Sequence, residues 1–329
     1  MIKDVLIIGA GPAGLYAWKT AADLGLTATI IESNKKYGGQ VTNLYPQKPV
    51  RNFPGYNEIK AEDAIHKLYD SILKDESKVN TKFNTTITNI KIIEPIENKE
   101  LFKNWFEVEF SDKTKQIFKT VLCTIGVGQY KKRRLFENDE KYTNIIYEFK
   151  DSNLFKNKKV VIFGGGDSAL DWANFIAPIA RKVSLVHRRT EFRAKSSSIE
   201  LAKKQNIELI YPYVFNSYVA EDNYVSSLEL KNVENEEHIK LDTDFIIVEF
   251  GVQFYGEAFN ILEIKKNDNS RICVDYRMSS SIEGFYAAGD ACAYEGKSRN
   301  ILSAFFEAMQ AIINIEKVIN DRKILNNGW

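Results

Sequence analysis

The sequence predicts an α/β protein that contains the same βαβ unit twice. A short apolar strand, a glycine-rich turn and a helix are expected in DVLIIGAGPAG at residues 4–14 and again in KKVVIFGGGDSA at residues 158–169. A second apolar strand follows each helix, and this alternation is typical of a parallel sheet covered by helices. Glycine turns between strand and helix are typical of Rossmann-like units, so the chain is expected to bind two nucleotides.

The first unit begins with residues 5–8, whose apolar, largely β-branched side chains are typical of a strand buried on both faces. A helix is expected over residues 12–24, where Gly25 ends it. The second strand, residues 28–31, ends at Glu32.

The second unit repeats this order. A strand over residues 160–163 is followed by a helix over residues 168–177, which Pro178 ends. The next strand, residues 183–186, leads into the basic run His187-Arg188-Arg189.

The remaining segments complete the expected architecture. Between the two units the chain is interpreted as mainly β, and a domain boundary is placed in the connector at residues 124–134. Strands are expected at residues 104–110, 117–123, 244–249 and 282–290, and a long helix at residues 300–319.

Composition limits the classes of protein. At 329 residues and 44% hydrophobic content, the chain is long enough for two domains with buried cores. Lys and Arg number 45 against 44 Asp and Glu, so net charge gives no reason to expect a nucleic-acid partner. No run approaches the length of a membrane span and the start does not resemble a signal peptide, so we expect a cytoplasmic protein that does not bind membranes.

The three cysteines, Cys123, Cys273 and Cys292, lie far apart in the sequence. They form no C-x-x-C and no metal-type cluster with the three histidines. A disulfide scaffold is therefore excluded, and no metal site is expected.

The first glycine turn, Gly9-Ala10-Gly11-Pro12-Ala13-Gly14, has the spacing of a dinucleotide site. Gly9 makes the tight turn, Gly11 lets the backbone approach a pyrophosphate, and Gly14 lets helix and strand pack closely. Glu32 is placed to accept the ribose hydroxyls and would repel a 2'-phosphate, so FAD or NAD is expected rather than NADP. The alternative is a glycine turn that binds nothing.

Two further segments favour a flavin at this first site. Gly38-Gly39-Gln40 could lie close to an isoalloxazine ring, and Asp290 in Ala287-Ala288-Gly289-Asp290 could accept a ribityl hydroxyl. Each segment by itself could equally be an ordinary turn.

The second turn carries Gly164, Gly166, Asp167 and Ser168, which are expected to contact the second nucleotide, with Ala169 in the packing position. Its second strand ends in Arg188 and Arg189, with Arg193 four residues further on. Guanidinium groups suit a 2'-phosphate, so this site should prefer NADPH to NADH. The alternative is a solvated basic loop, and His187 is expected to be an adenosine neighbour or a structural residue.

The motifs GAGPAG, GGQ, NFPG, GGGDSA, HRRTEFRA and AAGD occur in this order, and with them the chain resembles the low-molecular-weight thioredoxin reductase family of flavoproteins. The resemblance implies two Rossmann-like domains of three-layer ββα type, with the NADPH domain (residues 129–252) inserted into the FAD domain (residues 1–128 and 253–329). It implies FAD contacts from Gly9, Gly11, Pro12, Ala13, Gly14, Glu32, Gly39, Gln40, Asn52, Gly126 and Asp290. Asn300 and Ile301 would direct amides toward the flavin pyrimidine edge.

One departure from that family concerns the acceptor. Thioredoxin reductases carry a redox C-x-x-C before the second glycine motif, whereas residues 144–149 here read NIIYEF. The C-x-x-x-x-C of related disulfide reductases is also absent after Gly39. A bacillithiol-disulfide reductase would be expected to have Cys where Ala13 stands.

The remaining branch is that of the thioredoxin-reductase-like ferredoxin/flavodoxin-NADP reductases, which are homodimers. The chain is similar to it in GGQVTNLYPQK, HRRTEFRAKSSS and FYAAGDACAYEGK. The resemblance implies that Tyr45 stacks on the isoalloxazine, although a buried or turn aromatic is the alternative. Trp329 or another aromatic would cover the second flavin face.

This branch implies hydride transfer from NADPH to FAD, followed by single electrons to ferredoxin or flavodoxin. Two alternatives remain: a related enzyme with a quinone, flavin or oxygen as acceptor, and a non-enzymatic redox-sensing flavoprotein. The basic run Lys131 to Arg134 could attract an acidic ferredoxin or be a solvated connector.

Overall fold

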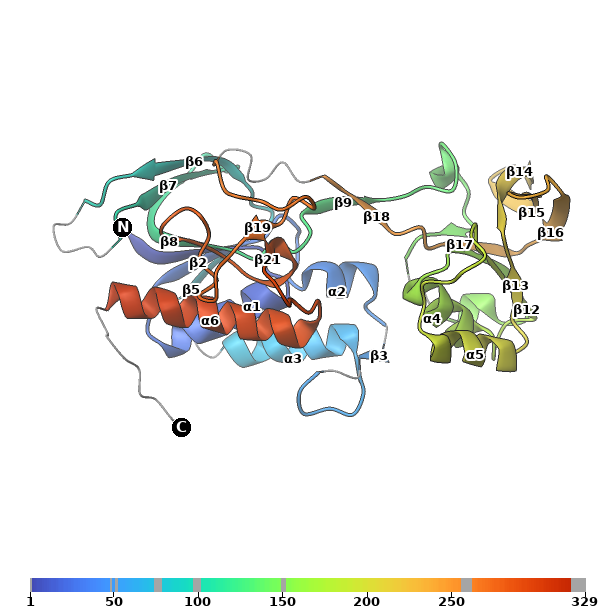
Figure 1. The fold of residues 1–329 in the computed structure, drawn as a ribbon, viewed down its shortest axis with the longest axis horizontal. Coiled ribbons are helices and arrows are strands. Elements are labelled where there is room, and N and C mark those ends of the chain that lie inside the picture. The colour runs from blue at the N-terminus through green and yellow to red at the C-terminus, as the bar shows by residue number, and fades with distance from the viewer. Residues whose placement is uncertain are drawn as a thin grey trace. The chain divides into compact units, whose positions relative to one another are not determined.

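A computed structural model describes residues 2–47, 49–50, 53–73, 79–96, 102–148, 152–255 and 262–320. The chain forms two compact units, one of residues 1–129 and 254–329 and the other of residues 130–253. The two connecting segments, β9 (Gln129–Lys132) and β18 (Val252–Tyr255), pair with each other (Figure 1). The first unit is therefore discontinuous in sequence.

The first unit is built on a seven-stranded sheet in the order β5-β2-β1-β8-β7-β6, with β20 also paired to β8. Strands β5, β2, β1, β8 and β20 run parallel, whereas β8, β7 and β6 form an antiparallel meander. The strand bounds are β1 Lys3–Ile8, β2 Ala28–Ile31, β5 Val79–Lys82, β6 Ile87–Ile93, β7 Trp105–Phe110, β8 Lys115–Cys123 and β20 Phe285–Ala287.

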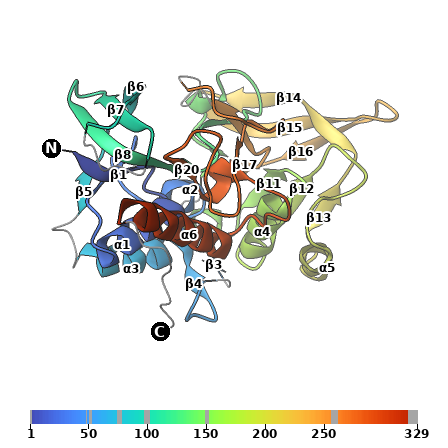
Figure 2. The same cartoon turned by 60° about the vertical axis from the view of Figure 1, so that its left-hand side comes forward.

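Alternate side chains of the central strand β1 enter different cores. Val5 and Ile7 pack against the helices α1 (Pro12–Asp23), α3 (Ala61–Leu73) and α6 (Ile301–Ile319). Leu6 and Ile8 instead pack under the antiparallel strands. Because successive strand residues face opposite sides, an unbroken apolar strand produces the ββα layering visible in Figure 2.

Two expectations for this unit were wrong in detail. The region after β2 is not mainly β, since it holds α2 (Gly39–Leu44) and the 13-residue helix α3. Strand β20 covers only three of the residues 282–290, because Gly284 has a φ of +82° and forms a turn before it. The small elements are β3 Pro49–Val50, β4 Ile59–Lys60, β19 Ile272–Cys273, η4 Gly289–Ala291 and β21 Cys292–Ala293.

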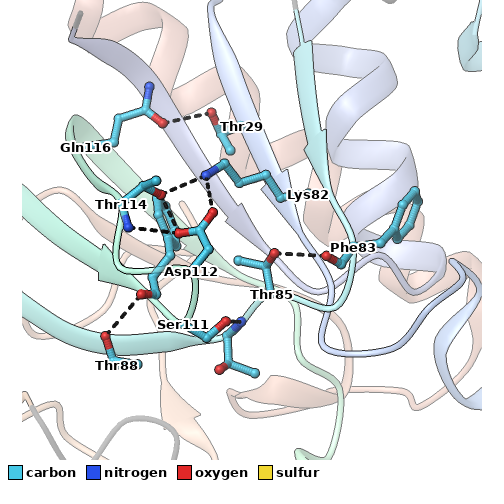
Figure 3. Close-up of polar contacts among 11 residues, drawn as sticks. Thr29, Lys82, Phe83, Thr85, Thr88, Ser111, Asp112, Thr114 and Gln116 are labelled. Atoms are coloured by element: carbon cyan, nitrogen blue, oxygen red, sulfur yellow. Dashed lines mark hydrogen bonds and ion pairs between the residues drawn. The ribbon is translucent and has the colours of Figure 1, made fainter.

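Polar side chains fasten the β7–β8 turn to the parallel strands (Figure 3). Lys82 of β5 donates to Asp112 Oδ2 (3.0 Å) and Thr114 Oγ1 (2.9 Å) in this turn. Thr29 of β2 donates to Gln116 Oε1 at 3.4 Å. Hydrogen bonds from Thr114 and then Lys82 lower the pKa of Asp112 to about 2, so the carboxylate stays ionised at physiological pH. These contacts hold the meander against the parallel layer.

The second unit has the same layering around a five-stranded parallel sheet in the order β10-β17-β11-β12-β13. Helices α4 (Asp167–Ile176) and α5 (Ser196–Lys204) cover one face, and the antiparallel strands β14, β15 and β16 cover the other. The strand bounds are β10 Ile145–Ile146, β11 Lys159–Phe163, β12 Lys182–Val186, β13 Glu208–Ile210, β14 Tyr213–Glu221, β15 Tyr224–Asn232, β16 His238–Asp242 and β17 Phe245–Val248. The short helices are η2 Asp139–Lys141 and η3 Ser152–Phe155.

Within the described part of the chain, none of the helices has the length and apolar character needed to cross a bilayer. The same residues contain no group of three or more His, Cys, Asp or Glu side chains arranged to hold a metal ion.

Candidate functional site

The first glycine turn connects β1 to α1, and steric contacts explain its glycines. Gly9 has a φ of +102°, and a Cβ there would lie 2.8 Å from the Thr124 carbonyl oxygen. A Cβ on Gly14 would lie 1.8 Å from the Gly9 carbonyl oxygen. Gly11 is the N-cap of α1 and Pro12 its first residue, which places the free amides of the helix start at the turn.

Glu32 follows β2 and directs its carboxylate toward this turn. Oε2 accepts a hydrogen bond from the Ala10 amide at 2.9 Å. Oε1 accepts from the amide and the side-chain nitrogen of Asn34, at 2.9 and 2.7 Å. The side chain is thus fixed where an acidic residue can accept ribose hydroxyls.

Two loops from other parts of the sequence meet the first turn. A Cβ added to Gly39 would lie 3.0 Å from the Gly11 Cα, so the start of α2 packs directly on the turn. A Cβ on Gly126 would lie 3.1 Å from Gln40 Nε2. The structure therefore brings together the loops at Gly11, Gly39, Gln40 and Gly126 that were assigned to one cofactor.

Asp290 lies in η4, beside the same turn. The preceding residue Gly289 has a φ of +69°, and a Cβ on it would lie 3.1 Å from Ala13 Cβ. Burial and, next, the charge of Asp290 raise the pKa of Tyr45 to about 12. The Asp290 carboxylate accepts no hydrogen bond from any residue that the structure describes, so it is available to a ligand hydroxyl.

The start of α6 completes the first site. Asn300 is the N-cap, and its Oδ1 accepts from the Ser303 amide at 2.9 Å. The side chain of Asn300 is therefore occupied by the helix, and the first-turn amides of Ile301 and Leu302 remain as donors. Asn52 and Trp329, assigned to FAD binding and flavin shielding, lie outside the described residues.

Arg271 is a site residue that sequence reasoning missed. Its Nη1 donates to the carbonyl oxygens of Gly126 (3.2 Å) and Asp290 (2.5 Å), which are two of the loops assigned to the flavin. No motif surrounds this arginine in the sequence, and its partner Gly126 lies 145 residues away from it in the chain. The role of Arg271 could therefore be recognised only from the three-dimensional structure.

The second glycine turn connects β11 to α4. Gly164 has a φ of +153°, and a Cβ there would lie 2.7 Å from Ala169 Cβ. A Cβ on Gly165 would lie 2.2 Å from the His187 ring. By contrast, no atom lies within 4 Å of the Cβ position of Gly166, the N-cap of α4, so a phosphate can approach the backbone there.

The segment after β12 folds back over this turn. The Arg193 amide donates to the Gly165 carbonyl oxygen at 2.8 Å, and the Lys195 amide donates to Asp167 Oδ1 at 3.0 Å. The His187 Nε2 atom lies 3.0 Å from the Glu191 carbonyl oxygen. Asp167 thus anchors the arginine loop, while Ser168 lies in the first turn of α4.

The three arginines of this loop place positive charge beside the turn. Arg188, Arg189 and Arg193 are exposed, and within the described ranges none has a carboxylate at ion-pair distance. Burial lowers the pKa of His187, and the nearby arginine charges lower it further. His187 is therefore neutral near pH 7, and the loop is suited to bind a dianionic phosphate.

Tyr147 lies in the segment where thioredoxin reductases would have their dithiol. Its hydroxyl donates to the buried carboxylate of Asp139 and accepts from the Leu135 amide at 2.8 Å. Arg134 Nη1 lies 3.0 Å from Asp139 Oδ1, and Lys132 donates to the Tyr147 carbonyl oxygen. Two cations of the Lys131 to Arg134 run are therefore engaged within the unit, which favours the structural interpretation of that run.

The three cysteines differ in burial, and chemical labelling can test this difference. Burial raises the pKa of Cys123 and of Cys292 to about 12, so roughly one thiol in ten thousand is ionised at pH 8. Cys273 is only partly buried. Iodoacetamide at pH 8 is expected to label Cys273 alone in the native protein and all three cysteines in denaturant, as peptide mass spectrometry would show. Native labelling of Cys123 or Cys292 would contradict this prediction.

Two glycine turns at the ends of parallel strands, each with its own acidic or basic partner segment, define a protein that binds two dinucleotides. Residues 3–311 match the family described as pyridine nucleotide-disulphide oxidoreductase, and the chain belongs to this family.

Among curated relatives, "Ferredoxin--NADP reductase" of Acholeplasma laidlawii (strain PG-8A) is 36% identical over 320 residues, which cover 97% of this chain and 95% of the relative. "Ferredoxin--NADP reductase 2" of Bacillus subtilis (strain 168) is 35% identical over 326 residues, covering 98% and 94%. The predicted resemblance to this branch is confirmed.

Solved structures agree on the fold. The thioredoxin reductase of Lactococcus lactis in its FR conformation is 25% identical and superposes with a TM-score of 0.78, over 97% of this chain and 99% of that one. The thioredoxin reductase of T. acidophilum also has a TM-score of 0.78, at 23% identity, and supports the fold alone. The predicted α/β class with two Rossmann-like domains is confirmed.

Proposed function

We propose that the chain is an FAD-dependent ferredoxin–NADP⁺ reductase that transfers electrons between NADPH and ferredoxin or flavodoxin. One observation carries the proposal: both dinucleotide turns are intact, yet hydrogen-bonded Tyr147 lies in the segment where a disulfide reductase would have its dithiol. Electrons entering such a protein need an acceptor outside the chain. The names of the relatives indicate ferredoxin as that acceptor.

The first unit is assigned to FAD because its acidic residue, Glu32, suits a ribose that lacks a 2'-phosphate. The α1 amides at Gly11 would face the pyrophosphate, and the unpaired Asp290 carboxylate would accept a ribityl hydroxyl. Tyr45, which ends helix α2, is the candidate ring for stacking on the isoalloxazine. The remaining FAD contacts are assigned to Gly9, Ala13, Gly14, Gly39, Gln40, Asn52, Gly126 and Ile301.

The second unit is assigned to NADPH. The open backbone at Gly166 would approach its pyrophosphate, and Arg188, Arg189 and Arg193 would bind the 2'-phosphate. Asp167 is assigned to the same site, where its Oδ1 also anchors the arginine loop through the Lys195 amide.

Bound FAD supplies the chemistry, because a flavin accepts two electrons as a hydride and releases them one at a time. The protein aligns the two cofactors and stabilises charge, and no side chain is required as an acid or base. The positive end of α6, at Ile301, would favour negative charge on the pyrimidine edge of a bound flavin. We also propose that the protein acts as a homodimer in the cytoplasm.

The test is NADPH-driven cytochrome c reduction by the anaerobically purified yellow protein, with and without ferredoxin. Ferredoxin is expected to increase the rate severalfold or more with NADPH and much less with NADH, because only NADPH uses the arginine loop. Rapid flavin reduction by NADPH without stimulation by ferredoxin would instead indicate a quinone, flavin or oxygen acceptor. Negligible turnover with every acceptor would indicate a redox-sensing flavoprotein.

A further inference from the structure

A buried ion pair lies behind the turn that carries Asp290. Glu307 of α6 is fully buried, and the side chain of Lys297 is 7% exposed. Their charged atoms are in direct contact. A buried ion pair generally adds little stability compared with apolar side chains of the same volume, so its position needs another explanation.

The Glu307 carboxylate contacts several hydrogen-bond donors between Gly289 and Lys297. Oε2 accepts from the Gly289 amide at 2.7 Å and lies 3.6 Å from Cys292 Sγ. Oε1 accepts from the Tyr294 hydroxyl at 2.8 Å and from Lys297 Nζ. Only an ionised carboxylate can accept from all these groups, since a glutamine amide would turn two donor hydrogens toward other donors.

These contacts hold the turn from behind, while another residue holds it from the opposite end. The Gly289 amide donates to Glu307, and Gly289 also packs beside Ala13 of the first glycine turn. These two contacts hold Gly289 in its left-handed conformation. Arg271 donates to the Asp290 carbonyl oxygen at 2.5 Å. The Gly289 amide and the Asp290 carbonyl oxygen are thus both held by protein side chains, while the Asp290 carboxylate stays available to a ligand.

We propose that Glu307, with its charge balanced by Lys297, is a positioning residue that sets the affinity for FAD by orienting the Gly289-Asp290 turn. The inference rests on the proposed assignment of the first unit to FAD. Glu307 touches the turn and not the ligand, so its contribution is to keep Asp290 preorganised before FAD binds.

The test measures the dissociation constant of FAD by diluting the holoenzyme and following the fluorescence of released FAD at 10 °C. Glu307→Gln removes the acceptor of the Gly289 amide. Glu307→Asp keeps the charge opposite Lys297 but shortens the reach by one methylene, so it covers the case in which the glutamine variant fails to fold. Glu316→Gln is the matched control, because Glu316 is also fully buried on α6 and bonds to Asn320 at 2.9 Å.

Both Glu307 variants are expected to raise the dissociation constant of FAD at least tenfold, and the control less than twofold. At saturating FAD, the Michaelis constant for NADPH should stay within twofold of wild type, because the second unit is unchanged. FAD binding within threefold of wild type in both variants would overturn the proposal, as would an equal loss in Glu316→Gln. A wild-type protein without FAD would refute the proposed function instead.

Discussion

Replacing Arg188 and Arg189 together with alanine is expected to raise the Michaelis constant for NADPH roughly 100-fold and that for NADH less than about threefold. A hydrogen bond to a charged group contributes about 1.5–3 kcal/mol, and each 1.4 kcal/mol corresponds to a factor of ten in affinity. Both side chains are exposed at the end of β12, so their removal leaves no buried group unpaired. Steady-state kinetics with both nucleotides would measure the effect.

Arg181→Ala is the matched control for this double substitution. Arg181 is an exposed arginine at the other end of β12, just before Lys182, and it should leave both Michaelis constants within about twofold. Because the two arginines are solvent-exposed, the preference for NADPH should also decrease as ionic strength rises. Equal losses for NADPH and NADH in the double variant would refute the assignment of the 2'-phosphate.

The predicted parts of the fold are those that local sequence determines. The runs before Gly9 and Gly164 have the length and β-branched character of buried strands, and both are the expected strands β1 and β11. The helix α3 was missed although its buried residues Ala61, Ala64, Ile65, Leu68 and Ile72 have helical spacing. The helical spacing was present in the sequence, but the β-rich segments that follow led us to interpret the whole region as mainly β.

Residues of the first site could be predicted from the sequence only where they belong to a known motif. Glu32 and Asp290 were proposed because each lies in a recognisable pattern, Glu32 directly after β2 and Asp290 in the AAGD segment that follows β20. Arg271 and Glu307 were not, because what they do depends on partners that the fold brings to them: Gly126 in one case and the Gly289 amide in the other. A charged residue between motifs carries no sign in the sequence that its side chain will be buried against a cofactor loop.

Asp167 shows that a motif residue can have a contact that the motif does not predict. It lies within the second glycine motif and was predicted to contact the cofactor. In the structure its Oδ1 accepts from the Lys195 amide, so the motif position serves the arginine loop. Motif spacing could not show this contact, because Lys195 is brought to Asp167 by the fold of the loop after β12.

Gly14→Ala is expected to prevent formation of a stable holoenzyme. The added Cβ would lie 1.8 Å from the Gly9 carbonyl oxygen and 2.8 Å from Thr124 Oγ1. Because these are backbone and buried atoms, α1 would have to move away from β1. Overpacking of this kind usually costs 1–3 kcal/mol, and we expect a loss of about 3 kcal/mol or more in the free energy of unfolding, measured by urea denaturation.

Gly166→Ala provides the contrasting variant in the second turn. No atom lies within 4 Å of its Cβ position and its φ of −103° is allowed for alanine, so the stability loss should stay below about 1 kcal/mol. NADPH binding should nevertheless weaken, because the methyl group would occupy the space that a pyrophosphate needs. The second unit already tolerates Ala169 where the first has Gly14, which means that α4 packs less closely on its strand than α1. A Gly14→Ala protein with normal stability and full FAD content would contradict this account of why the two turns differ.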